Sequence, residues 1–346
     1  IRISYDGSTY SNNAASIAVT AGQGRQFTCD TPSVKPKTNF TWTLTTDGNS
    51  FQPQGIQRDP INDNTLVNSS NTITLAIPES PATSQLMCAA TNRQDGLTDS
   101  EVDITVTLQI KVPPKASSMS LSGFSGSTPG SVDESKQHVI QCEVLGTRPA
   151  ATIEWYLDNV IQTTGTSTDT QTRGDELIDT TGSWMFIPSR ANHNMEVRCE
   201  ASTTESQRPL TSTVMTMLKV NGPPNTPMIT GSVSPLTENE QTTLTCTADM
   251  GYPDDWKLEW SNGAASLTGQ GGAPSLVGDR YTFTSTLDFI PTRENNTNII
   301  KCAAKKDSWP TSPEASAGPI NVQFCARTVS VTPCPSAVAA GSTLTF

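Results

Sequence analysis

The segment that decides the fold of this chain is Gln141-Cys142-Glu143-Val144, followed by Ala151-Thr152-Ile153-Glu154-Trp155-Tyr156-Leu157 and then by Glu196-Val197-Arg198-Cys199-Glu200-Ala201. The same Cys, Trp, Cys pattern occurs three times, and the other copies are Cys29, Trp42, Cys88 and Cys246, Trp260, Cys302. The spacing from the first cysteine to the tryptophan and from the first cysteine to the second is nearly the same in every copy. One unit therefore repeats about every 105 residues.

Alternate residues are apolar around each tryptophan and each second cysteine, as in Ile153, Trp155 and Leu157. This period of two predicts strands with one face in a core. A tryptophan packed on a disulfide between two sheets is typical of the immunoglobulin sandwich, and the repeat resembles the immunoglobulin superfamily. Because fewer than sixty residues separate the cysteines, the I-set or C2-set type is the better match. The resemblance implies three disulfides, Cys29–Cys88, Cys142–Cys199 and Cys246–Cys302, each beside its own tryptophan.

The repeat predicts an all-β fold of tandem immunoglobulin-like sandwiches, with three complete domains and the start of a fourth. Proline-bearing junctions at Pro113-Pro114 and 221–224 place the complete domains at residues 1–112, 113–222 and 223–324. Residues 325–346 begin the pattern again and stop before its first cysteine, so we expect a fourth domain that is truncated here. Cys325 and Cys334 belong to no framework, and they pair either with each other or with a cysteine beyond this sequence. The 269–278 segment reads as a loop.

A narrower resemblance rests on the end of each strand that precedes the second cysteine. There an apolar strand, Pro, Ser/Thr-Arg and an Asn-rich turn occur in 186–194 and 289–296, and 75–78 keeps only the strand and the proline. The tyrosine that many immunoglobulin domains carry two residues before this cysteine is replaced by Leu86, Val197 and Ile300. The pattern is similar to ectodomains of the nephrin, kirre and nectin adhesion families, which implies a cell-adhesion glycoprotein at the plasma membrane.

Two kinds of short motif suggest modification or binding. Asn39, Asn68 and Asn295 begin Asn-x-Ser/Thr sequons and are predicted N-glycosylation sites. Arg173-Gly174-Asp175 is the tripeptide that integrins read, although three-residue matches arise readily by chance. The acidic 59–64 segment resembles a calcium linker, but the other acidic clusters of such a site are missing, so no metal site is predicted.

Composition narrows the function classes. The net charge of −11 and the absence of a long Lys/Arg run argue against nucleic acid and against contact of this fragment with anionic membranes. The chain has eight cysteines, and the framework spacing of six of them indicates an oxidising, extracellular setting. No apolar run is long enough for a membrane-spanning helix, so we expect the membrane anchor to lie outside this fragment. The start at Ile1 is either a mature terminus or an arbitrary cut.

Sequence motifs of catalysis are lacking. The chain has two histidines, His138 and His193, and neither lies in a catalytic motif; no cofactor is predicted. We therefore expect no enzyme but an adhesion or recognition receptor that binds other immunoglobulin-type ectodomains, homophilically or heterophilically, with integrin as a further candidate partner. The alternatives are a structural matrix protein of many such repeats and a secreted or surface immune recognition receptor.

Overall fold

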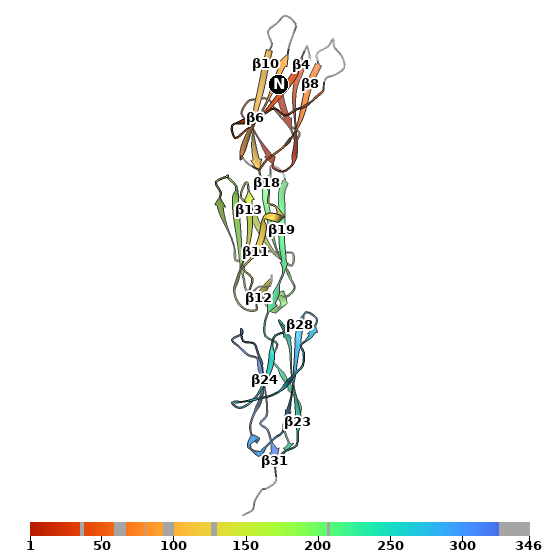
Figure 1. The fold of residues 1–346 in the computed structure, drawn as a ribbon, viewed down its shortest axis with the longest axis vertical. Coiled ribbons are helices and arrows are strands. Elements are labelled where there is room, and N and C mark those ends of the chain that lie inside the picture. Colours follow the sequence, from red (N-terminus) through yellow and green to blue (C-terminus); the bar gives the residue numbers. More distant parts are fainter. Residues whose placement is uncertain are drawn as a thin grey trace, which may run out of the picture. The chain divides into compact units, whose positions relative to one another are not determined.

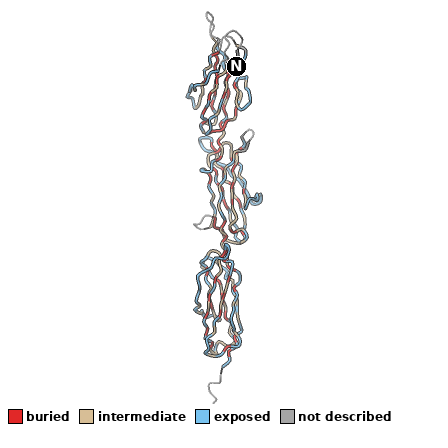
Figure 2. The backbone as a smooth tube through the Cα atoms, turned by 90° about the vertical axis from the view of Figure 1, so that its right-hand side faces the viewer, coloured by how far each residue is buried: buried red, intermediate tan, exposed pale blue. Residues whose placement is uncertain are grey.

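The structure is a computed structural model, and it describes residues 1–34, 38–58, 67–79, 81–92, 100–125, 130–205 and 208–324. These residues are built from strands (Figure 1), and their helices are three single 3-10 turns, η1 Ala116–Ser118, η2 Arg190–Asn192 and η3 Arg293–Asn295. No helix in these ranges has the length and apolarity that crossing a membrane requires. Buried residues follow the interior of each sandwich and exposed residues its outside (Figure 2).

The first sandwich packs two five-stranded sheets, in the orders β2-β1-β4-β8-β7 and β3-β10-β9-β5-β6. Its strands are β1 Arg2–Tyr5, β2 Ser8–Tyr10, β3 Ala15–Thr20, β4 Gly24–Val34, β5 Asn39–Thr46, β6 Asn49–Phe51, β7 Ile56–Arg58, β8 Val67–Ala76, β9 Thr83–Asn92 and β10 Ser100–Lys111. The initial segment supplies both sheets, because β1 pairs with β4 whereas β3 pairs in parallel with β10.

The second sandwich has two four-stranded sheets, β11-β13-β17-β16 and β15-β14-β18-β19, and a short β12-β20 pair. Its strands are β11 Met119–Ser122, β12 Ser131–Asp133, β13 His138–Thr147, β14 Thr152–Leu157, β15 Val160–Gln162, β16 Thr166–Thr172, β17 Ile178–Phe186, β18 Glu196–Glu205, β19 Arg208–Met217 and β20 Lys219–Asn221. Contacts group the first two sandwiches into one compact unit, Ile1–Val220.

The third sandwich lies in the second compact unit, Asn221–Phe346, and repeats the pairing scheme of the second sandwich. Its strands are β21 Met228–Thr230, β22 Leu236–Thr237, β23 Thr242–Gly251, β24 Lys257–Asn262, β25 Ala265–Leu267, β26 Gln270–Gly271, β27 Ser275–Val277, β28 Arg280–Phe289, β29 Ile300–Lys305, β30 Glu314–Ala317 and β31 Val322–Gln323. The segment expected to be a loop at 269–278 contains β26 and β27, which both pair with β28. Residues 325–346, with Cys325 and Cys334, lie outside the described ranges.

Each core is built on a tryptophan and a disulfide between two sheets. The bonds are Cys29–Cys88, Cys142–Cys199 and Cys246–Cys302, and they join β4 to β9, β13 to β18 and β23 to β29. The three tryptophans, Trp42, Trp155 and Trp260, are at most 2% exposed. The residues in place of the tyrosine, Leu86, Val197 and Ile300, are fully buried, so an apolar side chain fills that position in all three cores.

The three cores differ in the hydrogen bond that the tryptophan N–H group makes. Trp42 donates to Asn71 Oδ1 at 2.9 Å and Trp260 donates to Ser285 Oγ at 3.0 Å. Both acceptors lie on the strand position opposite the first cysteine, where the second sandwich has Gly182. Trp155 therefore has no acceptor for its N–H among the described residues. A Cβ at Gly182 would lie 2.7 Å from Ile153 Cγ2, so Ile153 occupies the space in which such an acceptor would stand.

The Pro-Ser/Thr-Arg-x-Asn segments of the second and third sandwiches are structural. Asn192 Oδ1 accepts hydrogen bonds from Ser189 N and Oγ, as Asn295 does from Thr292, which closes the 3-10 turns η2 and η3. The arginine of the motif forms a two-bond ion pair with a glutamate, Arg190 with Glu134 and Arg293 with Glu238. This motif therefore fixes the turn that leads into β18 and β29.

Candidate protein-binding face

The outward face of the β15-β14-β18-β19 sheet carries a row of four neighbouring side chains, one from each strand. Tyr156 on β14 lies opposite Ile161 on β15 and opposite Arg198 on β18, and Arg198 lies opposite Met215 on β19. Their neighbours Trp155 and Cys199 face the core, so alternation turns these four outward. We call Ile161, Tyr156, Arg198 and Met215 the second-sandwich row.

The centre of the row is fixed by its own contacts. The Arg198 guanidinium carbon lies 4.3 Å from the centre of the Tyr156 ring. Its Nη1 bonds Glu200 Oε2 at 3.1 Å, and its Nε lies 3.6 Å from Glu196 Oε1. Tyr156 Oη donates to Glu154 Oε2 at 2.9 Å, and this hydrogen bond raises the pKa of Tyr156. Both side chains are thus held in one orientation before any partner arrives.

The ends of the row are apolar and exposed. Ile161 is 47% exposed and Met215 is 61% exposed, and Met217, one outward step along β19, is 47% exposed. Tyrosine and arginine are, with tryptophan, the residues enriched among those that dominate binding energy at protein interfaces. Methionine side chains adapt their shape to a partner at little cost. A rigid centre flanked by exposed apolar side chains, with adaptable methionines at one end, suits recognition of another protein surface.

The equivalent rows of the other two sandwiches have no aromatic side chain and are mostly polar. In the third sandwich the four positions are occupied by Ser266, Ser261, Lys301 and Ser316. In the first sandwich β5, β9 and β10 present Thr43, Met87 and Thr105. Among these equivalent positions, an aromatic side chain beside an arginine, with apolar residues at both ends, is found in the second sandwich alone.

A smaller apolar cluster lies on the other sheet of the second sandwich. Val139 and Met185 are opposite each other on β13 and β17, at 43% and 46% exposed, and Ile187 follows at 64%. At the first two positions the third sandwich has Thr243 and Asp288, joined by a 2.7 Å hydrogen bond. This cluster lacks a charged or aromatic anchor, so the row is the stronger candidate.

The sequon asparagines differ in their surroundings. Asn39 on β5 and Asn68 on β8 are exposed. Asn295 is half-buried, and its side-chain oxygen caps the η3 turn. Glycosylation of all three remains a prediction.

The Arg173-Gly174-Asp175 tripeptide is exposed, but its residues are held by hydrogen bonds and an ion pair within the chain. Arg173 pairs with Asp179, with 2.7 Å between Nη2 and Oδ1, and Asp175 Oδ1 accepts the backbone N–H of Leu177. Arg148 Nη2 donates to the Asp175 carbonyl, and Arg148 Nη1 also donates to the Glu79 carbonyl of the first sandwich. The loop therefore belongs to the contact between the first two sandwiches. Integrin binding stays a prediction that these contacts do not favour.

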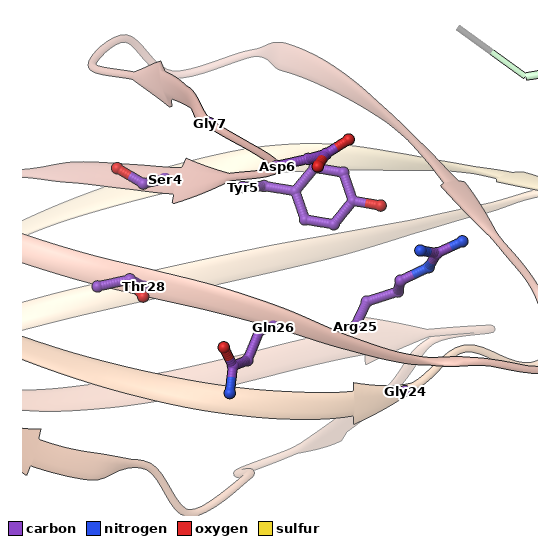
Figure 3. Close-up of a pocket in the computed structure, with 8 residues that line it drawn as sticks. All are labelled: Ser4, Tyr5, Asp6, Gly7, Gly24, Arg25, Gln26 and Thr28. Carbon is purple, nitrogen blue, oxygen red and sulfur yellow. The ribbon is translucent and has the colours of Figure 1, made fainter. Parts of the chain in front are cut away.

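A pocket of about 400 Å³ lies in the first sandwich (Figure 3). It is lined by residues of β1, its following turn and β4, namely Ser4, Tyr5, Asp6, Gly7, Gly24, Arg25, Gln26 and Thr28. The Tyr5 ring stacks on Phe27 with their centres 4.8 Å apart. This lining contains no histidine or cysteine and a single carboxylate, so it offers no acid and base pair. Among the described residues no three His, Cys, Asp or Glu side chains are grouped to hold a metal.

Sequence reasoning did not single out any member of the second-sandwich row. The available signal was parity, since Tyr156 and Arg198 each lie next to a framework residue whose inward direction is predicted. Parity identifies outward residues but not their neighbours on adjacent strands.

A disulfide packed on a tryptophan between two sheets is a hallmark of the immunoglobulin sandwich, and the three sandwiches of this chain are immunoglobulin-like domains. Residues 125–209 and 227–312 match the model of the CD80-like C2-set immunoglobulin domain. Among solved structures, a four-domain ICAM-5 ectodomain fragment is similar at 13% identity and a TM-score of 0.43, over 89% of this chain and 75% of that one. A marsupial T cell receptor is similar at 13% identity and 0.24, over 58% and 99%. Bovine butyrophilin is similar at 12% identity and 0.33, over 57% and 97%. These likenesses concern the fold alone, and no curated protein matches the chain in sequence.

Proposed function

We propose that this chain is part of the ectodomain of a cell-surface adhesion or recognition receptor, a glycoprotein that binds other immunoglobulin-type ectodomains and catalyses no reaction. The observation that carries the proposal is the second-sandwich row, with a stacked Tyr156–Arg198 centre and exposed apolar ends. A matrix spacer has no need of such a row, because spacing requires only the cores and the junctions. Domain boundaries near 112, 222 and 324 and a membrane anchor outside this sequence are part of the proposal.

The contact that this face makes is expected to be weak for one molecule. Stable protein interfaces bury roughly 1,600 Å² in total, and a row of four side chains on one sheet supplies only part of that area. Cells that adhere through many copies do not need a tight single contact, because avidity multiplies modest affinity. Adhesion therefore fits the row better than soluble high-affinity binding does.

The test uses the whole chain on beads, presented to an array of immobilised cell-surface ectodomains that includes the chain itself. The row variant carries Ile161→Ser, Tyr156→Ser and Met215→Ser, which recreate the serines of the third sandwich. The matched control carries Thr43→Ser, Met87→Ser and Thr105→Ser, which place serines at the equivalent positions of the first sandwich. We expect the row variant to lose about 30-fold or more of its binding, as for a hot spot of about 2 kcal/mol, while the control is unchanged.

Three results would contradict the proposal. Equal binding of the row variant and the unmodified chain would remove the row from recognition. Beads that stay dispersed against every ectodomain of the array would favour the matrix spacer. In a parallel assay with soluble non-self ligands, binding to these ligands and to no ectodomain of the array would favour the immune recognition alternative.

A further inference from the structure

We propose that the second-sandwich row binds the third sandwich of another copy of this chain, with acidic side chains of one copy meeting lysines of the other. The inference rests on the proposed function, because it names the partner of that same face. It follows from the charges that flank the row and from their counterparts on β24 and β29.

Two carboxylates lie directly opposite each other on the second-sandwich face. Glu154 on β14 is paired in register with Glu200 on β18. Opposed side chains on neighbouring strands are about 5 Å apart, and like charges at this distance repel each other. Arg198 neutralises part of the charge of the face through its ion pairs with Glu200 and Glu196, whereas Glu154 accepts a hydrogen bond from Tyr156. The face keeps an excess of negative charge beside its aromatic centre.

Two lysines lie directly opposite each other on the equivalent sheet of the third sandwich. Lys257 on β24 is paired in register with Lys305 on β29. Lys305 has an ion pair with Glu259, in which both side chains are more than half exposed, at 54% and 53%. Lys257 is exposed and has no acidic partner among the described residues. The opposed lysines therefore present the charge that complements Glu154 and Glu200.

The spacing of charges along the strands also matches. Glu196 and Glu200 are four residues apart on β18, and Lys301 and Lys305 are four residues apart on β29. Four residues of a strand span about 13 Å and keep both side chains on one face. Lys301 Nζ lies 2.8 Å from Glu314 Oε1, and the side chains of Lys301 and Glu314 are 41% and 50% exposed. Exposed ion pairs of this kind contribute little to stability, so a carboxylate of the partner copy can take the place of Glu314 at small cost.

The two faces differ in the size of their side chains as well as in charge. The second-sandwich row presents bulky side chains, whereas the equivalent positions of the third sandwich include Ser261, Ser266 and Ser316, with Ala303 on β29. A surface of small side chains can receive a row of large ones without a cavity or a clash. Pairing of two second-sandwich faces would instead oppose carboxylates to carboxylates. Charge and side-chain size thus favour a contact between unlike faces, which is the heterologous kind.

Charge reversal tests the contact with the full chain on beads. The acid-reversed variant carries Glu154→Lys and Glu200→Lys, and the lysine-reversed variant carries Lys257→Glu and Lys305→Glu. We expect unmodified beads to cluster, and each variant alone to cluster about tenfold less, because its two faces then carry the same sign of charge. A mixture of the two variants restores the opposite signs and returns clustering to within about twofold of the unmodified chain. Far-ultraviolet circular dichroism and thermal melting establish that the variants are folded.

A charge-matched control changes Glu101→Lys and Asp103→Lys, two exposed residues of β10 in the first sandwich. It should cluster like the unmodified chain. Failure of the mixture to cluster, or equal clustering of all populations, would overturn the inference. If unmodified beads bind only other ectodomains and lose this binding in the row variant, the partner is not a second copy, while the proposed function stands. If the row variant clusters like the unmodified chain, the proposed function fails as well.

Discussion

The second and third sandwiches share a pairing scheme residue for residue, but they differ on the outside. Trp155 and Trp260 lie opposite Cys199 and Cys302, and the register of β13 and of β23 shifts between the second and the fifth residue after the first cysteine. Outside, one face is tyrosine, arginine and methionine, and the other is serine and lysine. Positions that face the core must satisfy packing, whereas outward positions tolerate most side chains. Repetition of this fold therefore leaves each copy free to carry a different binding surface.

The largest expected effect concerns what the two sandwiches share. Replacing both cysteines of one disulfide with alanine, Cys142 with Cys199 or Cys246 with Cys302, should lower the free energy of unfolding of that sandwich by about 2–5 kcal/mol. The two losses should be similar, because the disulfides close loops of nearly equal length, with sequence separations of 57 and 56. Calorimetry of each variant measures the shift. If removal of one disulfide lowers the free energy of unfolding and removal of the other does not, the two cores are less alike than their strand pairing suggests.

The next effect concerns the point at which the two cores differ. Gly182→Ser should destabilise the second sandwich by about 1–3 kcal/mol, because its Cβ meets Ile153, although its hydroxyl could accept the Trp155 N–H. Ile153→Ala removes Cγ2 and Cδ1, the two atoms nearest to this Cβ, so Gly182→Ser should destabilise the Ile153→Ala variant less than it destabilises the unmodified chain. In the third sandwich, Ser285→Ala should cost about 1–3 kcal/mol, because the Trp260 N–H loses its acceptor. Urea unfolding followed by tryptophan fluorescence checks all three, and a stabilised Gly182→Ser variant would contradict the packing argument.

The smallest effect concerns Asp179, where the third sandwich has Thr282. Burial raises the pKa of Asp179, but hydrogen bonds from Arg173 and from the Gly146 N–H outweigh it, so the pKa is lowered overall. A lowered folded-state pKa gives stability that is present above the unfolded-state pKa and is lost as pH falls through the folded-state pKa. The contribution should be below about 1 kcal/mol, since the pair is partly exposed. Unfolding of the Asp179→Asn variant at neutral pH and near pH 3 should show a smaller acid loss than the unmodified chain shows.

Several features of the fold could be predicted from the sequence, because they depend on residues close together in the chain. The spacing of cysteine and tryptophan and the alternation around them indicate the sandwiches and the inward face of each central strand. The strands before Ala21 could not be predicted, because β1 and β3 are defined by partners far away, β4 and β10. The strands β26 and β27 could not be predicted for the same reason. Their glycine-rich segment has no hydrophobic periodicity, and it forms strands because it pairs with β28.

The candidate site divides in the same way. The sequence by itself determined that Tyr156, Arg198 and Met215 belong to strands and that alternation turns the first two away from the core. Only the tertiary structure decided that these three, which come from separate strands of the chain, stand side by side, and that Glu154 faces Glu200 while Lys257 faces Lys305. The physical reason is register. Alternation is a property of one strand, but a neighbour across a sheet is fixed by hydrogen bonds between strands, and a shift of one residue would replace every pair on the face.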